Sequence, residues 1–473
     1  MAKSSKLHNI KWKSIIYIYI LAFLVFSLMA ILPNWAERTS VKVSVQLTTT
    51  ALLLFSLGLY VYFVDRDTMV LRRKTVVMFT TMLLFYVMLE LAKLWEFGIY
   101  IVPFAFCSLM LSLIVSDKVA FFSNFVIVIL VCMQHINWPT QEGVLTEEFF
   151  YLLFSGVIES VYASYVFVRS NSRWRYILVG LVQGAISAAC CTLSYFMFQQ
   201  QPDWSNFALK VGLSFASGIL AVVFIFALVP LFERLFKVVS VFRYSEIASS
   251  DTALMRMLFE KAPGTYNHSL TVAIYVEASA VAIGLPGAMA RAAAYYHDIG
   301  KIKAPSYFAE NQFSGVNPHD SMTPEASVSM IKSHVVNGYA LGKEHNLPED
   351  VLNAILQHHG TMPIKYFYLK AQKYTDGVLP YEGYCYEGSK PTSKISAILM
   401  ICDAAEAALR SVGDKSRSEK IVDDIVAERL AFDQFSDCDI TMKEIDIVKS
   451  TIITTYNGIR HRRVKYPDVK LEI

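Results

Sequence analysis

The sequence predicts an all-α protein made of a polytopic membrane bundle followed by an all-helical soluble domain. The mean hydropathy of the 473-residue chain is +0.40 and 13% of its residues are aromatic, which does not suit a purely soluble protein. Apolar runs long enough to cross a bilayer recur up to about residue 232. After Val241 the apolar residues follow the spacing of amphipathic helices, interrupted by Pro and Gly, without a convincing run of alternating strands.

The membrane half contains apolar runs near the length of a spanning helix. We predict eight spans, at 15–32, 43–64, 75–92, 99–115, 119–136, 148–168, 175–198 and 209–232. The chain is accordingly divided into a basic N-terminus (1–14), a transmembrane bundle of about eight helices (15–232), a linker helix region (233–259) and a soluble domain (260–473).

The distribution of Lys and Arg predicts the orientation of these spans. If the N-terminus is cytoplasmic, most Lys and Arg residues fall in inside segments, and the outside segments hold only Arg38, Lys42, Lys93 and Lys210. An even number of spans then returns the chain to the cytoplasm, so the soluble domain is predicted to be cytoplasmic. The alternative of a cleaved signal peptide over Met1–Ala30 is weaker, because an apolar run of about eighteen residues suits an anchor. Both readings leave the soluble domain inside.

Two carboxylates fall within predicted spans. Glu90 and Glu159 would be costly in hydrocarbon, so both are expected to face the bundle interior or a cavity. A packing site and a sensory site remain equal alternatives for them.

Composition excludes several classes of function. The formal net charge is only +3, so a broad surface for DNA or RNA is not expected. The seven cysteines form no CxxC pair, and several lie in apolar runs, as Cys190 and Cys191 do. This pattern argues against a disulfide framework or a cysteine zinc site. Only His8 and His135 among ten histidines precede residue 240, which places the chemistry in the C-terminal half.

The soluble domain contains an ordered series of histidines and aspartates, namely His268, His297, Asp298, His334, His358, His359 and Asp403. The order His, His-Asp, Asp is similar to the ligand series of the HD phosphohydrolase superfamily, and it supplies the nitrogen and oxygen donors that divalent metals accept. The three further histidines exceed the needs of one metal. If Asp298 bridges through its two oxygens, the set suits two metals, which together can clamp a phosphodiester.

Two residues near these ligands add to the prediction. Asp403 lies on an expected helix, Lys394–Arg410, where it borders a buried apolar stripe, so its carboxylate needs a partner such as a metal. Lys301 follows the His297-Asp298 pair by about one turn. Its ammonium is expected to offset phosphate charge in the transition state, and a solvated surface lysine is the alternative.

These residues occur in phrases that resemble the seven-transmembrane HD family of bacterial cyclic di-AMP phosphodiesterases, the PgpH type. The matching phrases are Ala262 to Ser269, His297 to Lys301, Tyr307 to Gln312, Asn317 to Asp320, Ser333 to Val335, His358 to Thr361, Tyr366 to Tyr368, and Lys390-Pro391 before Asp403. His461 to Pro467 is similar to the family's C-terminal phrase. Together the phrases cover nearly all of residues 260–410.

The resemblance implies a bacterial inner-membrane protein that hydrolyses cyclic di-AMP to the linear dinucleotide pApA. It implies that the seven residues of the series bind two divalent metal ions, iron or manganese. The expected partners are the cyclic dinucleotide and the lipid bilayer, and a homodimer is left open. Members of the family typically carry a large extracellular domain after the first span, whereas here the corresponding loop is only about Pro33 to Lys42.

Substrate contacts are expected at Tyr307, Asn317, His319 and Tyr366, because they stand in family phrases and the tyrosines could stack on the bases. One alternative activity is a cyclic di-GMP phosphodiesterase, although His358-His359 is not followed by the Gly-Tyr-Pro phrase of that group. Another alternative is a catalytically silent membrane receptor that binds a nucleotide. Loss of catalysis in evolution normally removes metal ligands, however, and all seven ligands of the series are present.

Overall fold

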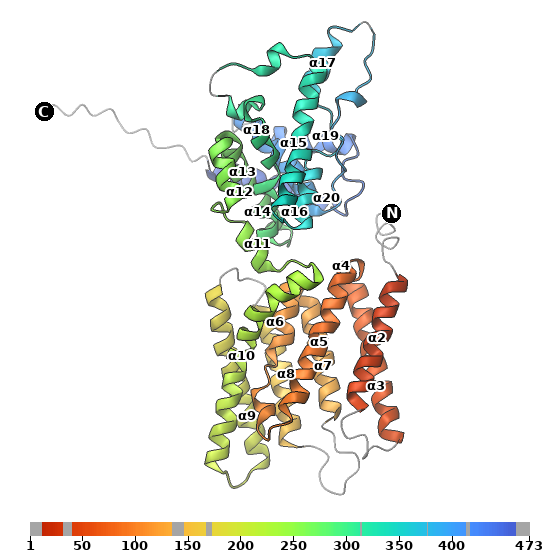
Figure 1. Cartoon of the computed structure of the whole chain (residues 1–473), viewed down its shortest axis with the longest axis vertical. Helices are drawn as coiled ribbons and strands as arrows, with labels where there is room; N and C mark the ends of the chain where they lie inside the picture. Colours follow the sequence, from red (N-terminus) through yellow and green to blue (C-terminus); the bar gives the residue numbers. More distant parts are fainter. Residues whose placement is uncertain are drawn as a thin grey trace, which may run out of the picture. The chain divides into compact units, whose positions relative to one another are not determined.

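A computed structural model of the chain describes residues 12–31, 40–134, 146–166, 173–312, 315–375, 377–412 and 417–459. The C-terminal phrase His461 to Pro467 and the loop Pro33 to Arg38 lie outside these residues. In the described part every regular element is a helix, and one isolated bridge pairs Pro363 with Cys385. The all-α prediction is therefore confirmed. The chain divides into two compact units, Met1–Phe242 and Arg243–Ile473 (Figure 1).

Unit 1 consists of long helices that run alternately up and down (Figure 1). They are α2 (Trp12–Ile31), α3 (Ser40–Val64), α4 (Arg66–Val70), α5 (Arg72–Ala92), η3 (Gly98–Ile101), α6 (Ala105–Ile114), α7 (Asp117–Gln134), α8 (Glu147–Val166), α9 (Arg173–Phe198) and α10 (Trp204–Phe236). Apart from the short α4 and η3, each of these helices occupies one of the predicted spans.

Five of the described helices are long and apolar enough to cross a membrane: α2, α3, α5, α9 and α10. Large apolar side chains on them face outward, including Tyr17 (71% exposed) and Phe63 (70% exposed). Such surfaces are stable against lipid rather than water. Unit 1 is therefore a membrane unit.

The predicted span 99–115 is interrupted in the structure and is not one continuous helix. The chain forms the 3₁₀ turn η3, breaks around Pro103, and then forms α6, which has only ten residues. Ten helical residues extend about 15 Å, roughly half of a hydrocarbon core. Pro103 explains the break, because it has no N–H for a helical hydrogen bond.

The two carboxylates predicted in spans have different surroundings. Glu90 is half-buried and its Oε1 lies 2.8 Å from Lys93 Nζ. Glu159 on α8 is completely buried, as expected, and neither of its carboxyl oxygens has a hydrogen-bond partner among the residues that the structure describes. Gln183 on α9 donates its side-chain N–H to the backbone carbonyl of Glu159 at 3.2 Å.

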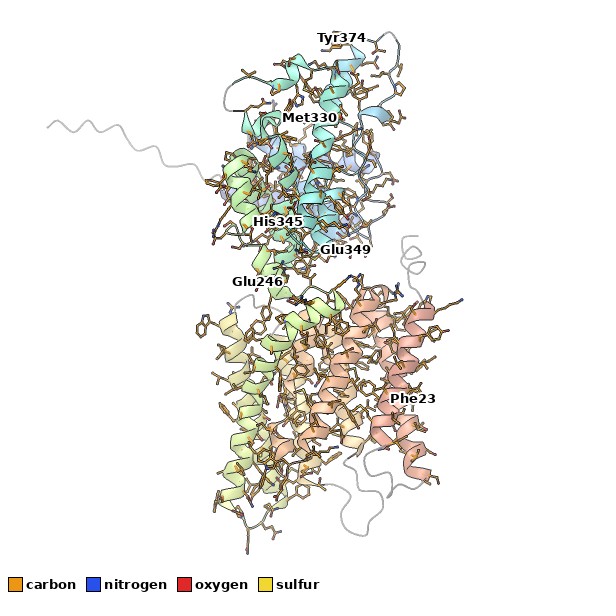
Figure 2. The ribbon with its side chains drawn as sticks, in the orientation of Figure 1. Phe23, Glu246, Met330, His345, Glu349 and Tyr374 are labelled. Atoms are coloured by element: carbon orange, nitrogen blue, oxygen red, sulfur yellow. The ribbon has the colours of Figure 1, made fainter. Side chains whose placement is uncertain are left out.

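Unit 2 consists of shorter helices. They are α11 (Val241–Ile247, which begins at the end of unit 1), α12 (Ala253–Lys261), α13 (Pro263–Ala282), α14 (Gly287–Tyr296), η5 (Ile299–Lys303), η6 (Pro305–Tyr307), η7 (Ala309–Asn311), η8 (Pro318–Ser321), α15 (Pro324–Glu344), α16 (Glu349–Gln357), α17 (Lys365–Gln372), η9 (Glu382–Tyr384), α18 (Lys394–Val412), α19 (Ser418–Ala431) and α20 (Met442–Ile459). Met330 lies on α15, and His345 follows its last residue (Figure 2).

The core of unit 2 lies where α13, α14, α18 and α20 pack together. The helix expected over Lys394–Arg410 is α18, and its apolar stripe is buried as predicted: Ile398, Leu399 and Cys402 have no exposed surface. Burial of this stripe fixes the rotation of α18, so Asp403, the next residue, lies at the border of the core. The same packing places His268 of α13 opposite α18.

Candidate metal centre

The seven residues of the predicted series come together in unit 2, although they come from separate elements. His268 lies on α13, His297 and Asp298 follow α14, His334 lies on α15, His358 and His359 follow α16, and Asp403 lies on α18. Two groups each place their donor atoms within 4.8 Å of one another: His268, His297 and Asp298 form one, and Asp298, His334, His358 and His359 form the other. Asp298 belongs to both groups.

The first group is completed by Asp403. Its Oδ1 lies 2.9 Å from His268 Nε2 and 3.6 Å from His297 Nε2. Asp298 Oδ2 lies 3.3 Å from His297 Nε2 and 3.8 Å from His268 Nε2. Two imidazoles and two carboxylates thus converge on one small volume, which is a donor set suited to a divalent metal.

The second group uses the other oxygen of Asp298. Asp298 Oδ1 lies 3.3 Å from His334 Nε2 and 3.6 Å from His358 Nε2. The rings of His358 and His359 are in contact, with centroids 4.0 Å apart, and His359 Nδ1 is 3.9 Å from Asp403 Oδ2. The two oxygens of one buried carboxylate therefore face two separate histidine sets.

Backbone hydrogen bonds fix how three of these imidazoles are protonated. Nδ1 of His297, His334 and His358 each lies 2.5–2.7 Å from the carbonyl oxygen three residues earlier. A carbonyl only accepts, so each Nδ1 donates, and each neutral ring presents a lone pair at Nε2. Such a contact on the far ring nitrogen is the usual orienting partner of a metal-binding histidine.

This arrangement fits metal ions better than it fits hydrogen bonding among the protein groups. The Nε2 atoms of His334 and His358, both acceptors in this tautomer, face each other at 3.3 Å. His297 Nε2 and Asp298 Oδ1 are buried without a hydrogen-bond partner among the described residues. Buried polar atoms left unpaired are costly. A cation placed among them removes that cost.

The carboxylates of the cluster retain their charge despite burial. Burial raises the pKa of Asp298, but the Lys301 ammonium and His297 outweigh it and hold that pKa well below its usual range. Burial likewise raises the pKa of Asp403, but the hydrogen bond from His268 and the nearby His297 lower it further than burial raises it. Negative charge is therefore fixed at the centre of the site.

The imidazoles respond to that charge differently in the two groups. Burial lowers the pKa of His268, but hydrogen bonds to Asp403 and Glu406 outweigh it and raise that pKa to about 9. The pKa of His297 is raised to about 10, because the charge of Asp298 outweighs burial. For His334 burial dominates and lowers the pKa to about 3. With protein groups alone, the carboxylates hold protons on His268 and His297. A bound divalent metal would replace those protons.

Glu406 was missed by the sequence analysis. Its Oε2 lies 2.6 Å from His268 Nδ1, and its side chain is 6% exposed. It stands one helical turn after Asp403 on α18, so the spacing Asp-x-x-Glu on a buried face was the available signal. Glu406 holds the ring of His268 so that Nε2 faces the cluster.

Lys301 lies beside the cluster, where it is held by two carboxylates. Its Nζ is 2.7 Å from Asp298 Oδ2 and 2.9 Å from Glu310 Oε1, and it lies over the Phe308 ring. The side chain is only 12% exposed. The carboxylates outweigh burial and raise the pKa of Lys301. Glu310 was missed as a site residue, although it stands within the family phrase Tyr307 to Gln312.

A pocket of about 250 Å³ opens next to the cluster and includes His358, His359 and Asp403 in its lining. Tyr386 lines it and stacks on His359, with ring centroids 4.2 Å apart and planes 20° apart. Lys365 and Arg429 bring two positive charges to it, and Glu428, which also lines the pocket, pairs with both. Arg429 Nε is buried without a hydrogen-bond partner among the described residues, while the guanidinium pairs with Glu428.

The four residues predicted as substrate contacts lie elsewhere in unit 2. His319 is buried, its Nε2 lies 2.9 Å from the carbonyl oxygen of Tyr307, and its ring contacts Tyr307 and Phe367. Asn317 caps η8 by accepting the N–H of His319. Tyr366, on α17, is 65% exposed, and Tyr374 just beyond this helix is also exposed (Figure 2). None of the four is among the residues that line the described pocket.

Two family models match the chain, "7TM receptor with intracellular HD hydrolase" over residues 41–240 and "HD domain" over residues 265–408. The first interval runs from α3 to the residues just after α10 and so contains seven of the predicted spans. The second contains the whole histidine and aspartate series.

Relatives of known name agree with these models. The chain is 36% identical over 374 residues to "Cyclic-di-AMP phosphodiesterase PgpH" of Listeria monocytogenes serotype 1/2a (strain 10403S), covering 78% of this chain and 51% of that protein. It is 33% identical over 442 residues to the protein of the same name from Bacillus subtilis (strain 168), covering 89% of this chain and 60% of that protein.

Over the matched region the chain is 43% identical in sequence to the chain in the crystal structure of the L. monocytogenes PgpH HD domain in complex with cyclic-di-AMP, with a TM-score of 0.43. The match covers 45% of this chain and 99% of the crystallised chain. The chain spans between 51% and 60% of the length of the two curated relatives. The two models together match most of the chain, which therefore combines a membrane unit similar to the "7TM receptor with intracellular HD hydrolase" family with a unit similar to the "HD domain" family.

Proposed function

We propose that the chain is a membrane-anchored, metal-dependent phosphodiesterase that hydrolyses cyclic di-AMP to linear pApA at a two-metal site. The observation that carries the proposal is the position of Asp298, whose two carboxyl oxygens face two separate sets of histidines. The choice of cyclic di-AMP rests on the names of the two PgpH relatives and on the family phrases around the ligands.

The metals would divide the seven ligands. His268, His297, Asp298 and Asp403 would hold one, and Asp298, His334, His358 and His359 the other, with iron or manganese as the metals. Two divalent metals in such a site offset the charge of a phosphodiester and make water a better nucleophile at neutral pH.

The protein residues would then orient the metal ligands and bind the phosphates of the substrate. Hydrogen bonds at Nδ1 keep the histidine lone pairs directed at the cluster. Lys301 neutralises part of the charge that gathers around Asp298 and, as predicted from the sequence, would offset charge on the phosphate. Arg429 and Lys365 in the adjoining pocket share one counterion, Glu428, and would supply the remaining positive charge for the second phosphate of a cyclic dinucleotide.

The proposed location is a bacterial inner membrane, with the N-terminus and the catalytic unit in the cytoplasm. The excess of Lys and Arg at one end of the membrane helices supports this orientation. The proposed domain limits are 1–14, 15–232, 233–259 and 260–473.

The test is hydrolysis by the purified full-length chain in lipid nanodiscs, loaded with Mn²⁺ or Fe²⁺. Cyclic di-AMP, cyclic di-GMP and guanosine tetraphosphate are supplied separately, and products are identified by mass spectrometry. We expect pApA from cyclic di-AMP at a rate at least tenfold above the other two substrates. Equal cleavage of cyclic di-GMP would remove the adenine assignment, and absence of all cleavage with both metals bound would favour a silent receptor.

A further inference from the structure

A second cavity lies in the membrane unit, at one end of its helices. It measures about 550 Å³ and is lined by residues of α2, α5 and the end of α10. All three helices are long and apolar enough to cross a membrane. The lining residues belong to the first two turns of α2 and α5 and to the end of α10 with its C-cap Lys237. The cavity therefore lies at the level where membrane helices meet the lipid headgroups.

The polar part of this cavity is cationic. Arg72, Arg73 and Lys237 line it, and no acidic residue is among its described lining residues. Arg72 donates to Ser14 Oγ at 3.2 Å, and Arg73 donates to the carbonyl oxygen of Lys237 at 3.3 Å. These contacts orient both guanidinium groups at the cavity, whose lining therefore carries three positive charges. An anion bound in the cavity would offset that charge.

The rest of the lining is apolar and open on its outer side. Tyr17 on α2 is 71% exposed and Leu235 on α10 is 64% exposed, with Ile18 beside them. On membrane-spanning helices such surfaces contact acyl chains. The cavity therefore combines a cluster of cations with a hydrocarbon wall.

We propose that this cavity binds an anionic phospholipid, with the headgroup phosphate among Arg72, Arg73 and Lys237 and an acyl chain along Tyr17 and Leu235. A free phosphate compound would use the cations but leave the apolar wall uncovered, and a zwitterionic lipid would cover the wall but bring its own cation. The bound lipid would contact the last turn of α10, which leads into the catalytic unit.

The test measures lipid retention on the full-length chain by native mass spectrometry. Phosphatidylglycerol and phosphatidylcholine with identical acyl chains are offered in detergent micelles, with soluble glycerol 3-phosphate as a competitor. Wild type is expected to retain phosphatidylglycerol selectively, and glycerol 3-phosphate is expected not to displace it. The double variant Arg72→Gln/Lys237→Gln should lose affinity about 25-fold, at about fivefold for each removed charge.

Two further variants separate a specific site from general charge attraction and from misfolding. Arg66→Gln/Arg234→Gln removes the same charge from α4 and α10 without touching the cavity lining and should retain phosphatidylglycerol. Arg72→Lys/Lys237→Arg keeps both charges and should bind within about twofold of wild type. Equal loss in the Arg66/Arg234 variant, equal retention of phosphatidylcholine, or displacement by glycerol 3-phosphate would each overturn the proposal.

Discussion

His268 Nδ1 and Glu406 Oε2 form a 2.6 Å hydrogen bond between residues 138 positions apart in the sequence. The bond turns His268 Nε2 toward Asp298 and Asp403. Because such partners orient a metal-binding histidine and raise its basicity, their loss typically lowers metal affinity about 10–100-fold. Glu406→Ala is therefore expected to lower Mn²⁺ affinity by that amount, measured as metal content after dialysis against graded free Mn²⁺.

The same measurement has two controls. Glu406→Gln retains an oxygen that can accept from Nδ1, so its metal content should lie between wild type and Glu406→Ala. Glu419→Ala removes an exposed carboxylate from α19 and should behave as wild type. An unchanged metal content in Glu406→Ala would show that the hydrogen bond serves only packing.

Asp298→Ala removes the carboxylate shared by both groups, so turnover should fall below detection while unit 1 remains folded. The measurement combines hydrolysis of cyclic di-AMP with metal content, which should fall by at least half. Asp437→Ala, at an exposed position of the same unit, is the matched control and should retain full activity. Retained turnover in Asp298→Ala would contradict the proposed site.

Lys301→Ala should lower the rate at saturating substrate by about a hundredfold with metal content unchanged, the scale of losing one electrostatic donor. Lys301 also pairs with Glu310, so a variant of Glu310 can be compared with Lys301→Ala. Glu310→Gln leaves the ammonium beside Asp298 and should keep the rate within about fivefold of wild type. If both variants lose the rate equally, Lys301 acts through its ion-pair network rather than on the phosphate.

Sequence patterns predicted those parts of the molecule whose causes are local. The buried stripe of Ile398, Leu399 and Cys402 predicted α18 and the position of Asp403 on it. The span 99–115 is interrupted at Pro103, whose missing N–H ends the helical hydrogen bonding. The ordered series also predicted that its seven ligands meet, but no pattern predicted the contacts of residues outside that series.

The unpredicted parts of the site are such contacts. Arg429 reaches the pocket from α19, beyond the interval 265–408 matched by the HD model. Tyr386 lies in a loop after η9, and only the packing of that loop places its ring on His359. Tyr366, by contrast, stands close to His359 in sequence but is on an exposed face of α17.

Glu159→Gln is expected to leave the membrane unit as stable as wild type or more stable. Within the described part of the chain this buried carboxyl group has no hydrogen-bond partner, so it carries a desolvation cost, which a neutral amide of similar size reduces. The measurement is the midpoint of thermal unfolding in detergent. Glu90→Gln, which breaks the half-buried contact with Lys93, is the comparison and should lower the midpoint slightly. A marked loss of stability in Glu159→Gln would show that the charge has an unseen cationic partner.

Three tyrosines are candidates for contact with the bases: Tyr307, Tyr366 and Tyr386. If Tyr307 and Tyr366 stack on the bases, as the sequence predicts, Tyr307→Ala and Tyr366→Ala should weaken cyclic di-AMP binding more than they lower the saturated rate. The pocket beside the metal ligands favours Tyr386, because it lines that pocket and stacks on His359. Stacking on one base is typically worth about 1–3 kcal/mol, so Tyr386→Ala should raise KM by roughly 5- to 150-fold.

Measuring KM and the saturated rate for Tyr307→Ala, Tyr366→Ala and Tyr386→Ala in parallel separates these positions. Tyr386→Phe keeps the ring and should stay within about twofold of wild type. Tyr374→Ala, at an exposed position just beyond α17, is the control for surface aromatics. A larger KM change in Tyr366→Ala than in Tyr386→Ala would place the substrate on the α17 side of the cluster, because loss of a ring costs affinity only where a base stacks on it.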